Sequence, residues 1–169
     1  HHLLQTQPGR VRSAVLGGAI TKLNLFAKSL IKFAWLIRNF IPFMWLYRIL
    51  AWILMPRGNH KSSRRFFIQE AYKMKRKNFL AWYPLAGDVK TTYSNVQEKS
   101  RNVPKLYISG AEDHMFVREL AEDLHGDTSS ELVILERCGH VCNIEKAEEF
   151  NELSLEFMDK HQVKKANIS

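Results

Sequence analysis

An α/β fold is predicted by three features of this 169-residue sequence. Three short runs are rich in apolar residues, as strands are, and they cover 11–16, 105–108 and 131–135. A helical pattern at 116–124 separates the last two runs. Proline and glycine mark a turn before the first run, at Pro8-Gly9. Because a helical crossover most simply joins parallel strands, we expect one sheet whose strands end at a common edge.

The composition is that of an ordinary globular chain, with 46% hydrophobic and 25% charged residues. A chain of this length buries roughly 68 to 70% of the surface that its unfolded form exposes, so it can hold a core without metal or disulfide bonds. The two cysteines, Cys138 and Cys142, suit a reducing compartment better than a secreted scaffold. We therefore expect a cytoplasmic protein.

Positive charge is concentrated in the first half of the chain. Residues 1–80 carry 15 Lys and Arg against the single acid Glu70, a net charge of +14, whereas residues 81–169 carry 10 against 16 acids, a net charge of −6. In the basic half the cations alternate with large apolar residues, and no zinc-finger, RRM or KH pattern accompanies them. We therefore expect no nucleic-acid partner.

The range 21–100 is expected to be mostly helical. Apolar residues recur there at spacings of three and four, which indicates an amphipathic helix with an apolar side formed by Leu23, Phe26, Leu30, Phe33 and Ile37. The apolar stretch at 40–55 is interrupted by Pro42 and Arg48 and falls short of the ~20 residues that a membrane span needs. A basic helix is then expected over 62–82, with one side formed by Phe66, Phe67, Ala71, Met74 and Phe79.

Each of the last two predicted strands is followed by a titratable side chain. Asp113 lies in the loop after 105–108, and His140 lies in the loop after 131–135. Ligands bind at this edge of open α/β sheets, and the two side chains can meet there. A carboxylate bonded to an imidazole fixes the imidazole tautomer and stabilises the imidazolium, as a general base requires. Two simpler interpretations stay open here, an Asp that caps a helix and a His that is merely solvated.

Three segments resemble the α/β-hydrolase superfamily. Residues 103–116, VPKLYISGAEDHMF, are similar to its acid-bearing strand and loop, and residues 138–150, CGHVCNIEKAEEF, are similar to its histidine loop and last helix. Ala147 stands where proline is common in the family. Residues 7–18, QPGRVRSAVLGG, resemble the strand that follows the nucleophile helix. The order and spacing of the three segments agree with the family's fold.

The resemblance implies the carboxyl-terminal part of an α/β-hydrolase sheet with an inserted helical cap. Residues 1–20 would hold the end of the nucleophile helix and a core strand, and 21–100 would hold the cap or lid. Residues 101–169 would form the core segment that carries the catalytic acid, Asp113, and the general base, His140.

The resemblance also shows what is missing. No G-x-S-x-G motif, which forms the strained turn beneath a nucleophilic serine, occurs in the 169 residues. In the family the serine precedes the acid and the histidine, so we expect it upstream of His1, within about two or three helical turns. The complete enzyme is expected to hydrolyse an ester or a related acyl compound by a Ser-Asp-His mechanism, without cofactor or metal. The 169-residue chain alone is expected to be inactive and poorly soluble.

Neighbouring residues have simpler interpretations. Glu112 is a competing acid, but the second of the two acids carries the role in the resembled motif. Cys138, His140 and Cys142 could suggest zinc, yet zinc usually takes three or four protein ligands and the chain has no third cysteine. Glu145 is expected to be a first-turn acid that the helix dipole favours. Surface positions are expected for His114 and His125.

Aromatic residues are frequent in the helical range, and we expect each of them to pack rather than to take part in chemistry, with some lining a substrate entrance: Trp35, Phe43, Trp45, Tyr47, Trp52, Trp82 and Tyr83. Because they alternate with Lys and Arg, contact with a membrane surface stays open. Alternatives to the ester hydrolase are a carbon-carbon bond hydrolase or a dehalogenase on the same fold, and a non-catalytic protein that binds a membrane surface or a partner. Fold does not name a substrate, so the natural substrate, chain-length preference and oligomeric state are not predicted.

Overall fold

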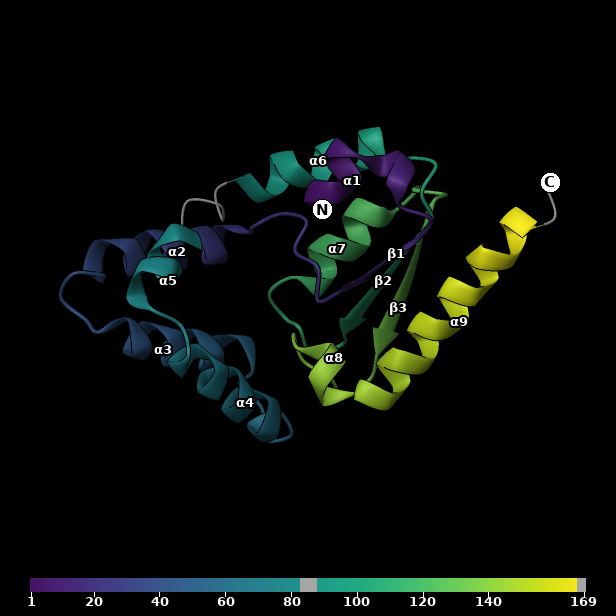
Figure 1. The fold of residues 1–169 in the computed structure, drawn as a ribbon. Coiled ribbons are helices and arrows are strands. Elements are labelled where there is room, and N and C mark those ends of the chain that lie inside the picture. Colours follow the sequence, from purple (N-terminus) through teal and green to yellow (C-terminus); the bar gives the residue numbers. More distant parts are fainter. Residues whose placement is uncertain (83–87, 167–169) are drawn as a thin grey trace.

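A computed structural model describes residues 1–82 and 88–166 of the chain (Figure 1). Tyr83 and the side chains of Phe79 and Trp82 lie outside the described part, so the expectations for them stay untested.

The sheet contains three parallel strands, in the spatial order β1 (Ala14–Gly17), β2 (Lys105–Gly110) and β3 (Ser130–Leu135). The expected parallel sheet is confirmed. β1 begins later than the run at 11–16 suggests, because the N–H of Val11 donates to the carbonyl oxygen of Pro8 at 3.0 Å and so belongs to the preceding turn.

Helices cover both faces of the sheet, with α8 (Cys142–Glu145) and α9 (Ala147–Ala166) on one face and α6 (Val89–Lys99) and α7 (Val117–Leu124) on the other (Figure 1). Side chains alternate along β2 between the two faces. Ile108 belongs to a buried cluster with Phe157 of α9. Tyr107 belongs to a cluster with Tyr93 of α6 and Leu120 of α7. α9 therefore packs on one face of β2, and α6 and α7 pack on the other.

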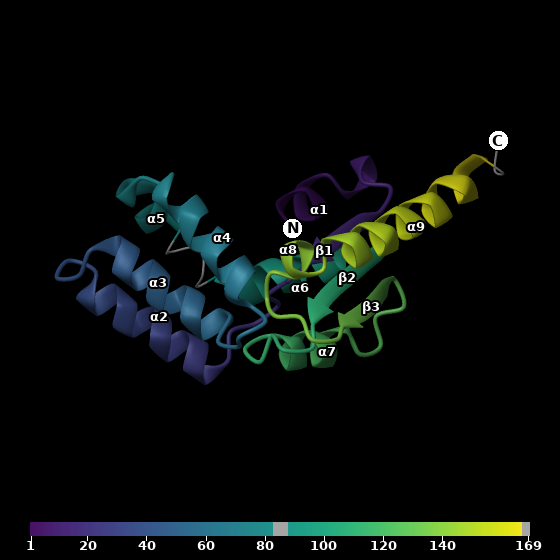
Figure 2. The same cartoon turned by 90° about the horizontal axis from the view of Figure 1, so that it is seen from below.

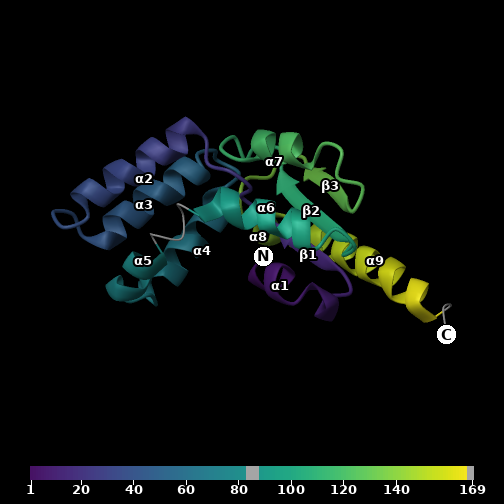
Figure 3. The same ribbon diagram turned by 90° about the horizontal axis from the view of Figure 1, so that it is seen from above.

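A short helix, α1 (His2–Thr6), lies beside α6 (Figure 3). The side-chain amide of Gln5 donates to the carbonyl oxygen of Thr92 at 2.7 Å, and Leu4 shares a buried cluster with Val96. Although α6 falls within the range expected for the cap, Tyr93 and Val96 place it against the sheet and α1.

A second group of helices lies beyond the carboxyl ends of the strands and contains α2 (Leu25–Ile37), α3 (Phe43–Leu54), α4 (Lys61–Tyr72) and α5 (Arg76–Trp82) (Figures 1 and 2). Asn24 caps α2, since its Oδ1 accepts from the N–H of Ala27 at 2.8 Å. The side-chain amide of Asn24 also donates to the carbonyl oxygen of Met115 at 3.1 Å. Ala27, Met55 and Phe116 share one buried cluster, so the group packs directly on the loop after β2.

The buried side of α2 differs in part from the expected one: Leu23, Leu30 and Ile37 are half-buried, but Phe26 and Phe33 are not. Phe26 and Phe33 are both 59% exposed, whereas Ala27 is buried in a cluster with Ala51 of α3. Adjacent residues of a helix are about 100° apart, so the buried stripe is displaced by one residue from the predicted side. Ala27 and Ala51 share this cluster with Met55 and Phe116, and the Asn24 cap fixes where α2 begins.

The basic helix expected over 62–82 is interrupted between Tyr72 and Arg76. The N–H of Lys73 donates to the carbonyl oxygen of Glu70 at 3.1 Å, and that of Met74 donates to Ala71 at 3.0 Å. These bonds span three residues, as in a tight turn, and they end α4.

Some aromatic residues of this group pack and others are exposed. Tyr47 stacks on Phe67 with ring centroids 4.7 Å apart, as expected. The packing expectation is wrong for three tryptophans that are at least 40% exposed: Trp35, Trp45 and Trp52. The guanidinium of Arg64 covers the ring of Trp52 at 3.7 Å. Within 1–82 and 88–166, no helix has the length and apolar character needed to cross a membrane.

Candidate active site

Two loops meet at the carboxyl edge of the sheet. The loop after β2 carries Asp113, and the loop after β3 carries His140. Backbone hydrogen bonds connect the two loops, since the N–H of Ala111 donates to Leu135 at 2.9 Å and the N–H of Glu112 donates to Cys138 at 2.8 Å. The strand pairing therefore continues into the first residues of the loops.

Asp113 and His140 are in direct contact. The Nδ1 of His140 lies 2.8 Å from the Oδ2 of Asp113. Asp113 is 1% exposed, whereas the side chain of His140 is 16% exposed, so one end of the pair is buried and the other reaches the surface. With its proton held on Nδ1 by the carboxylate, the neutral imidazole presents Nε2 as a base.

The pair has an unmatched polar atom. The second carboxylate oxygen of Asp113, Oδ1, is buried without a hydrogen-bond partner among the described residues. The carbonyl oxygen of Asp113 accepts from the N–H groups of Phe116 and Val117, and no side chain in the described part of the chain caps α7. The helix-cap interpretation of Asp113 is therefore wrong.

Two neighbours shape the surroundings of His140. The ring of Phe116 lies 5.4 Å from the imidazole, centroid to centroid, with the rings tilted by 52°. Gly18, directly after β1, adopts a φ of +57°, and a β carbon there would lie 2.5 Å from the carbonyl oxygen of His140. Only glycine combines this conformation with so close an approach.

Glu112, the competing acid, makes different contacts. Its Oε2 lies 2.7 Å from the Nε2 of His60 and accepts from the side-chain amide of Asn59 at 2.9 Å, while its Oε1 accepts from Arg57 at 2.5 Å. The hydrogen bond from Asn59 lowers the pKa of Glu112, and the contacts with His60 and Arg57 act in the same direction. Asp113, not Glu112, contacts His140. The sequence did not reveal these three partners, because they lie more than fifty positions away in a segment without a motif.

Glu145 does more than stabilise a helix end. It lies in the single turn of α8, as expected, but its Oε2 accepts a hydrogen bond from the N–H of Gly139 at 2.9 Å. The contact therefore holds the backbone directly before His140.

Both cysteines are buried in the core next to this loop. Burial raises the pKa of the Cys138 thiol to about 12 and also raises that of Cys142. The Sγ of Cys142 donates to the carbonyl oxygen of Ile108 at 3.4 Å. Neither thiol is therefore poised as a nucleophile or a metal ligand. His114 and His125 are exposed, as expected.

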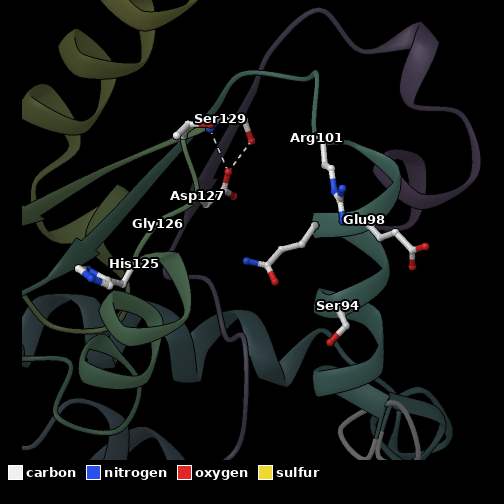
Figure 4. A pocket seen from close by; sticks show the side chains of 9 residues that line it. Ser94, Glu98, Arg101, His125, Gly126, Asp127 and Ser129 are labelled. Carbon is white, nitrogen blue, oxygen red and sulfur yellow. Dashed lines mark hydrogen bonds between the residues drawn. The ribbon is translucent and has the colours of Figure 1, made fainter.

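One pocket lies away from the Asp113–His140 pair. It has a volume of about 520 Å³ and lies between α6 and the turn before β3, where its wall includes Ser94, Glu98, Arg101, His125, Asp127 and Ser129 (Figure 4). Asp127 accepts from the N–H and the hydroxyl of Ser129 at 2.9 and 2.7 Å. This pocket is at the amino ends of the strands, opposite to His140. A second pocket of about 430 Å³ is lined by residues that include Asn59, Ser63, Arg137 and Glu145.

Comparison with solved structures finds a similar fold in a crystal structure from a study of carboxylesterases of the ammonia-oxidizing thaumarchaeon Nitrososphaera gargenis. The TM-score is 0.71, the two sequences are 21% identical, and the match covers 96% of this chain and 61% of that one. This likeness shows the fold. The chain thus spans about three fifths of the length of that protein. No protein-family model and no curated protein sequence matches the chain.

Proposed function

We propose that this chain is the acid- and base-bearing part of a serine hydrolase that cleaves an ester or a related acyl compound. The observation that carries the proposal is the 2.8 Å contact between the Nδ1 of His140 and the buried carboxylate of Asp113. Support comes from the fold, which is shared with a carboxylesterase over 96% of the chain. The family resemblance of both loops points to the same roles.

In this mechanism the Nε2 of His140 takes the proton of a serine hydroxyl as the serine oxygen bonds to the acyl carbon. Asp113 stabilises the imidazolium that forms, without itself becoming protonated. His140 then gives the proton to the departing alcohol when the ester carbon-oxygen bond breaks. A water molecule, activated in the same way, releases the acid and restores the serine.

The serine is assigned to the polypeptide upstream of His1. The 169 residues contain no G-x-S-x-G, and the family order places the serine before the acid. In this proposal α1 is the end of the nucleophile helix, and helices α2–α5 form a cap. The packing of Ala27 and Met55 on Phe116 supports the cap assignment, because it joins those helices to the loop of the catalytic acid.

Substitution in the complete polypeptide tests the assignment of the base. His140→Ala should lower the kcat for a p-nitrophenyl ester by about 10³-fold or more, while thermal unfolding stays nearly unchanged. Asp113→Asn should also lower kcat strongly, since it allows the wrong imidazole tautomer. His114→Ala is the matched control, because His114 is exposed and next to Asp113. Turnover that survives His140→Ala would assign the base to another residue.

A fluorophosphonate probe tests the position of the nucleophile. The complete polypeptide should be labelled on one serine upstream of His1, and the 169-residue chain should remain unlabelled and inactive. Labelling of a serine within the chain would overturn the upstream assignment. An upstream G-x-D-x-G would instead favour the dehalogenase alternative.

We propose a second function, in which the exposed surface of α2 and α3 contacts an anionic membrane surface. The range 21–82 holds 13 Lys and Arg against Glu70 alone. The side chains on α2 and α3 that are large, apolar and at least 40% exposed include Leu25, Phe26, Phe33, Leu36, Trp45, Ile49 and Trp52. Cations beside exposed aromatic residues suit the headgroup layer of anionic lipids.

Co-sedimentation with vesicles tests this contact. Phosphatidylglycerol-containing vesicles should retain the protein, pure phosphatidylcholine vesicles should retain much less, and added salt should weaken the binding. The double variant Trp45→Ser, Ile49→Ser should lower binding, whereas Leu155→Ser, at an exposed position on α9, should not. Equal binding of both variants, or no binding to anionic vesicles, would contradict the proposal.

A further inference from the structure

His60 is a buried side chain to which the hydrolysis mechanism assigns no role. It lies immediately before α4, in the helical group, and is fully buried. Its Nε2 lies 2.7 Å from the Oε2 of Glu112 and 3.6 Å from the Oε2 of Glu145. One imidazole therefore faces two carboxylates, one in the loop after β2 and one in α8.

The first carboxylate belongs to the loop of Asp113. Glu112 directly precedes Asp113, and its N–H donates to the carbonyl oxygen of Cys138 at 2.8 Å. Arg57 and Asn59, from the same turn as His60, bind the same carboxylate. This turn of the helical group is therefore anchored next to the acid.

The second carboxylate belongs to α8 and contacts the loop of His140. The Oε2 of Glu145 accepts from the N–H of Gly139, the residue directly before His140. His60 also touches Gly139 itself, since a β carbon at Gly139 would lie 3.0 Å from the Cε1 and 3.1 Å from the Nε2 of the imidazole. The imidazole thus packs on the peptide that leads into His140.

We propose that His60 is a positioning residue, which holds the loops of Asp113 and His140 at a fixed separation and couples them to helices α2–α5. The inference rests on the proposed function only in calling Asp113 and His140 catalytic. If helices α2–α5 moved, the Nε2 of His60 would no longer lie between the two carboxylates. The placement of these helices and the geometry of the Asp113–His140 pair therefore change together.

The protons on His60 follow from its surroundings. Nε2 must carry a proton, because both atoms that face it are carboxylate oxygens. Nδ1 is buried and has no hydrogen-bond partner within the described ranges. A neutral Nε2–H tautomer leaves Nδ1 as an unpaired acceptor, whereas the Nδ1–H tautomer would bury an unpaired donor and set a lone pair against Glu112.

Two amide variants of His60 separate the effect of losing its hydrogen bond from the effect of changing its side-chain size. The side-chain nitrogen of Gln reaches about as far as Nε2 of His, whereas that of Asn reaches only about as far as Nδ1. In His60→Asn, the amide hydrogen of Gly139 should exchange about tenfold faster, as expected for the loss of roughly one hydrogen bond, and His60→Gln should restore slow exchange. His114→Asn, at an exposed position, should have no effect.

These measurements use nuclear magnetic resonance on the complete polypeptide without ligand, so a failure of ester hydrolysis would leave them unchanged. Unaltered exchange of Gly139 in His60→Asn would overturn the inference. A second measurement needs no variant, because the ring nitrogen shifts of His60 in the unaltered chain report its tautomer. Detection of the neutral Nδ1–H form would overturn the inference even if His60→Asn did not fold.

Discussion

The backbone of Gly18 lies against the carbonyl oxygen of His140, where a β carbon would be only 2.5 Å away. The residue directly after β1 therefore packs against the backbone of the His140 loop. Because φ at Gly18 is also +57°, an alanine there meets both backbone strain and a clash with an atom that cannot rotate away.

We expect Gly18→Ala to lower the free energy of unfolding by about 1 to 3 kcal/mol. Urea unfolding followed by circular dichroism measures the change. Gly9→Ala is the matched control, since a β carbon at Gly9 would meet nothing within 4 Å. Equal midpoints for the two variants would show that the contact with His140 is not tight.

The displaced face of α2 gives a second prediction. Ala27→Leu should destabilise the protein by about 1 to 3 kcal/mol, because it adds three carbon atoms to a packed cluster. Phe33→Ser should change the free energy of unfolding by no more than about 0.5 kcal/mol, because Phe33 is mostly exposed. Thermal unfolding of both variants tests the prediction, and the reverse order would favour the face that the sequence pattern indicates.

The buried thiols give a third prediction. Since burial raises the pKa of Cys138 to about 12, almost none of it is thiolate at pH 8. We expect Ellman's reagent to titrate neither cysteine of the folded protein within minutes and to titrate both in guanidinium chloride. Ser62→Cys, at an exposed position, should add one rapidly reacting thiol. Rapid reaction of the unaltered protein would show that the His140 loop opens.

Acid should weaken the contacts of Glu112. Its pKa in the folded protein is lowered, chiefly by the hydrogen bond from Asn59, so the folded state binds fewer protons than the unfolded state. This stabilisation is present above the unfolded pKa of about 4.3 and is lost as the pH falls through the lower folded value.

Urea unfolding between pH 3 and pH 7 tests this linkage. The difference in unfolding free energy between the unaltered protein and Glu112→Gln should be largest at pH 7 and should shrink toward pH 3. The exposed Glu156 provides the control variant Glu156→Gln, whose difference should stay nearly constant. A Glu112→Gln difference that does not depend on pH would show that the carboxylate makes no charge-dependent contact.

The sheet and the contact between Asp113 and His140 could be predicted from the sequence for a local reason. A strand, the turn after it and the side chain that follows are adjacent in the chain, and the parallel arrangement brings two such turns to one edge. The family resemblance also predicted that Asp113, and not the adjacent Glu112, faces the histidine, because the second acid of the motif holds that position.

His60 and the buried face of α2 could not be predicted in this way. His60 gains its role from Glu112 and Glu145, which are 52 and 85 positions away, and nothing in its own turn marks it. In α2, Phe26 and Phe33 follow the helical period as well as Ala27 does, and hydropathy favours the larger side chains. The buried face depends on the cluster that Ala27 shares with Ala51 and Phe116 and on the hydrogen bond from Asn24 to Met115, which belong to tertiary structure.

Helices α2–α5 all belong to one insertion, which begins after β1 at Gly18 and ends at α6. The entropic cost in free energy of closing such an insertion grows only with the logarithm of its length, by about 0.6 kcal/mol for each doubling. The register of β1 on β2 is set within the strands themselves. Evolution can therefore lengthen, shorten or exchange this insertion at little cost in folding free energy. The turn that holds His60 must be kept if the loops of Asp113 and His140 are to stay in position.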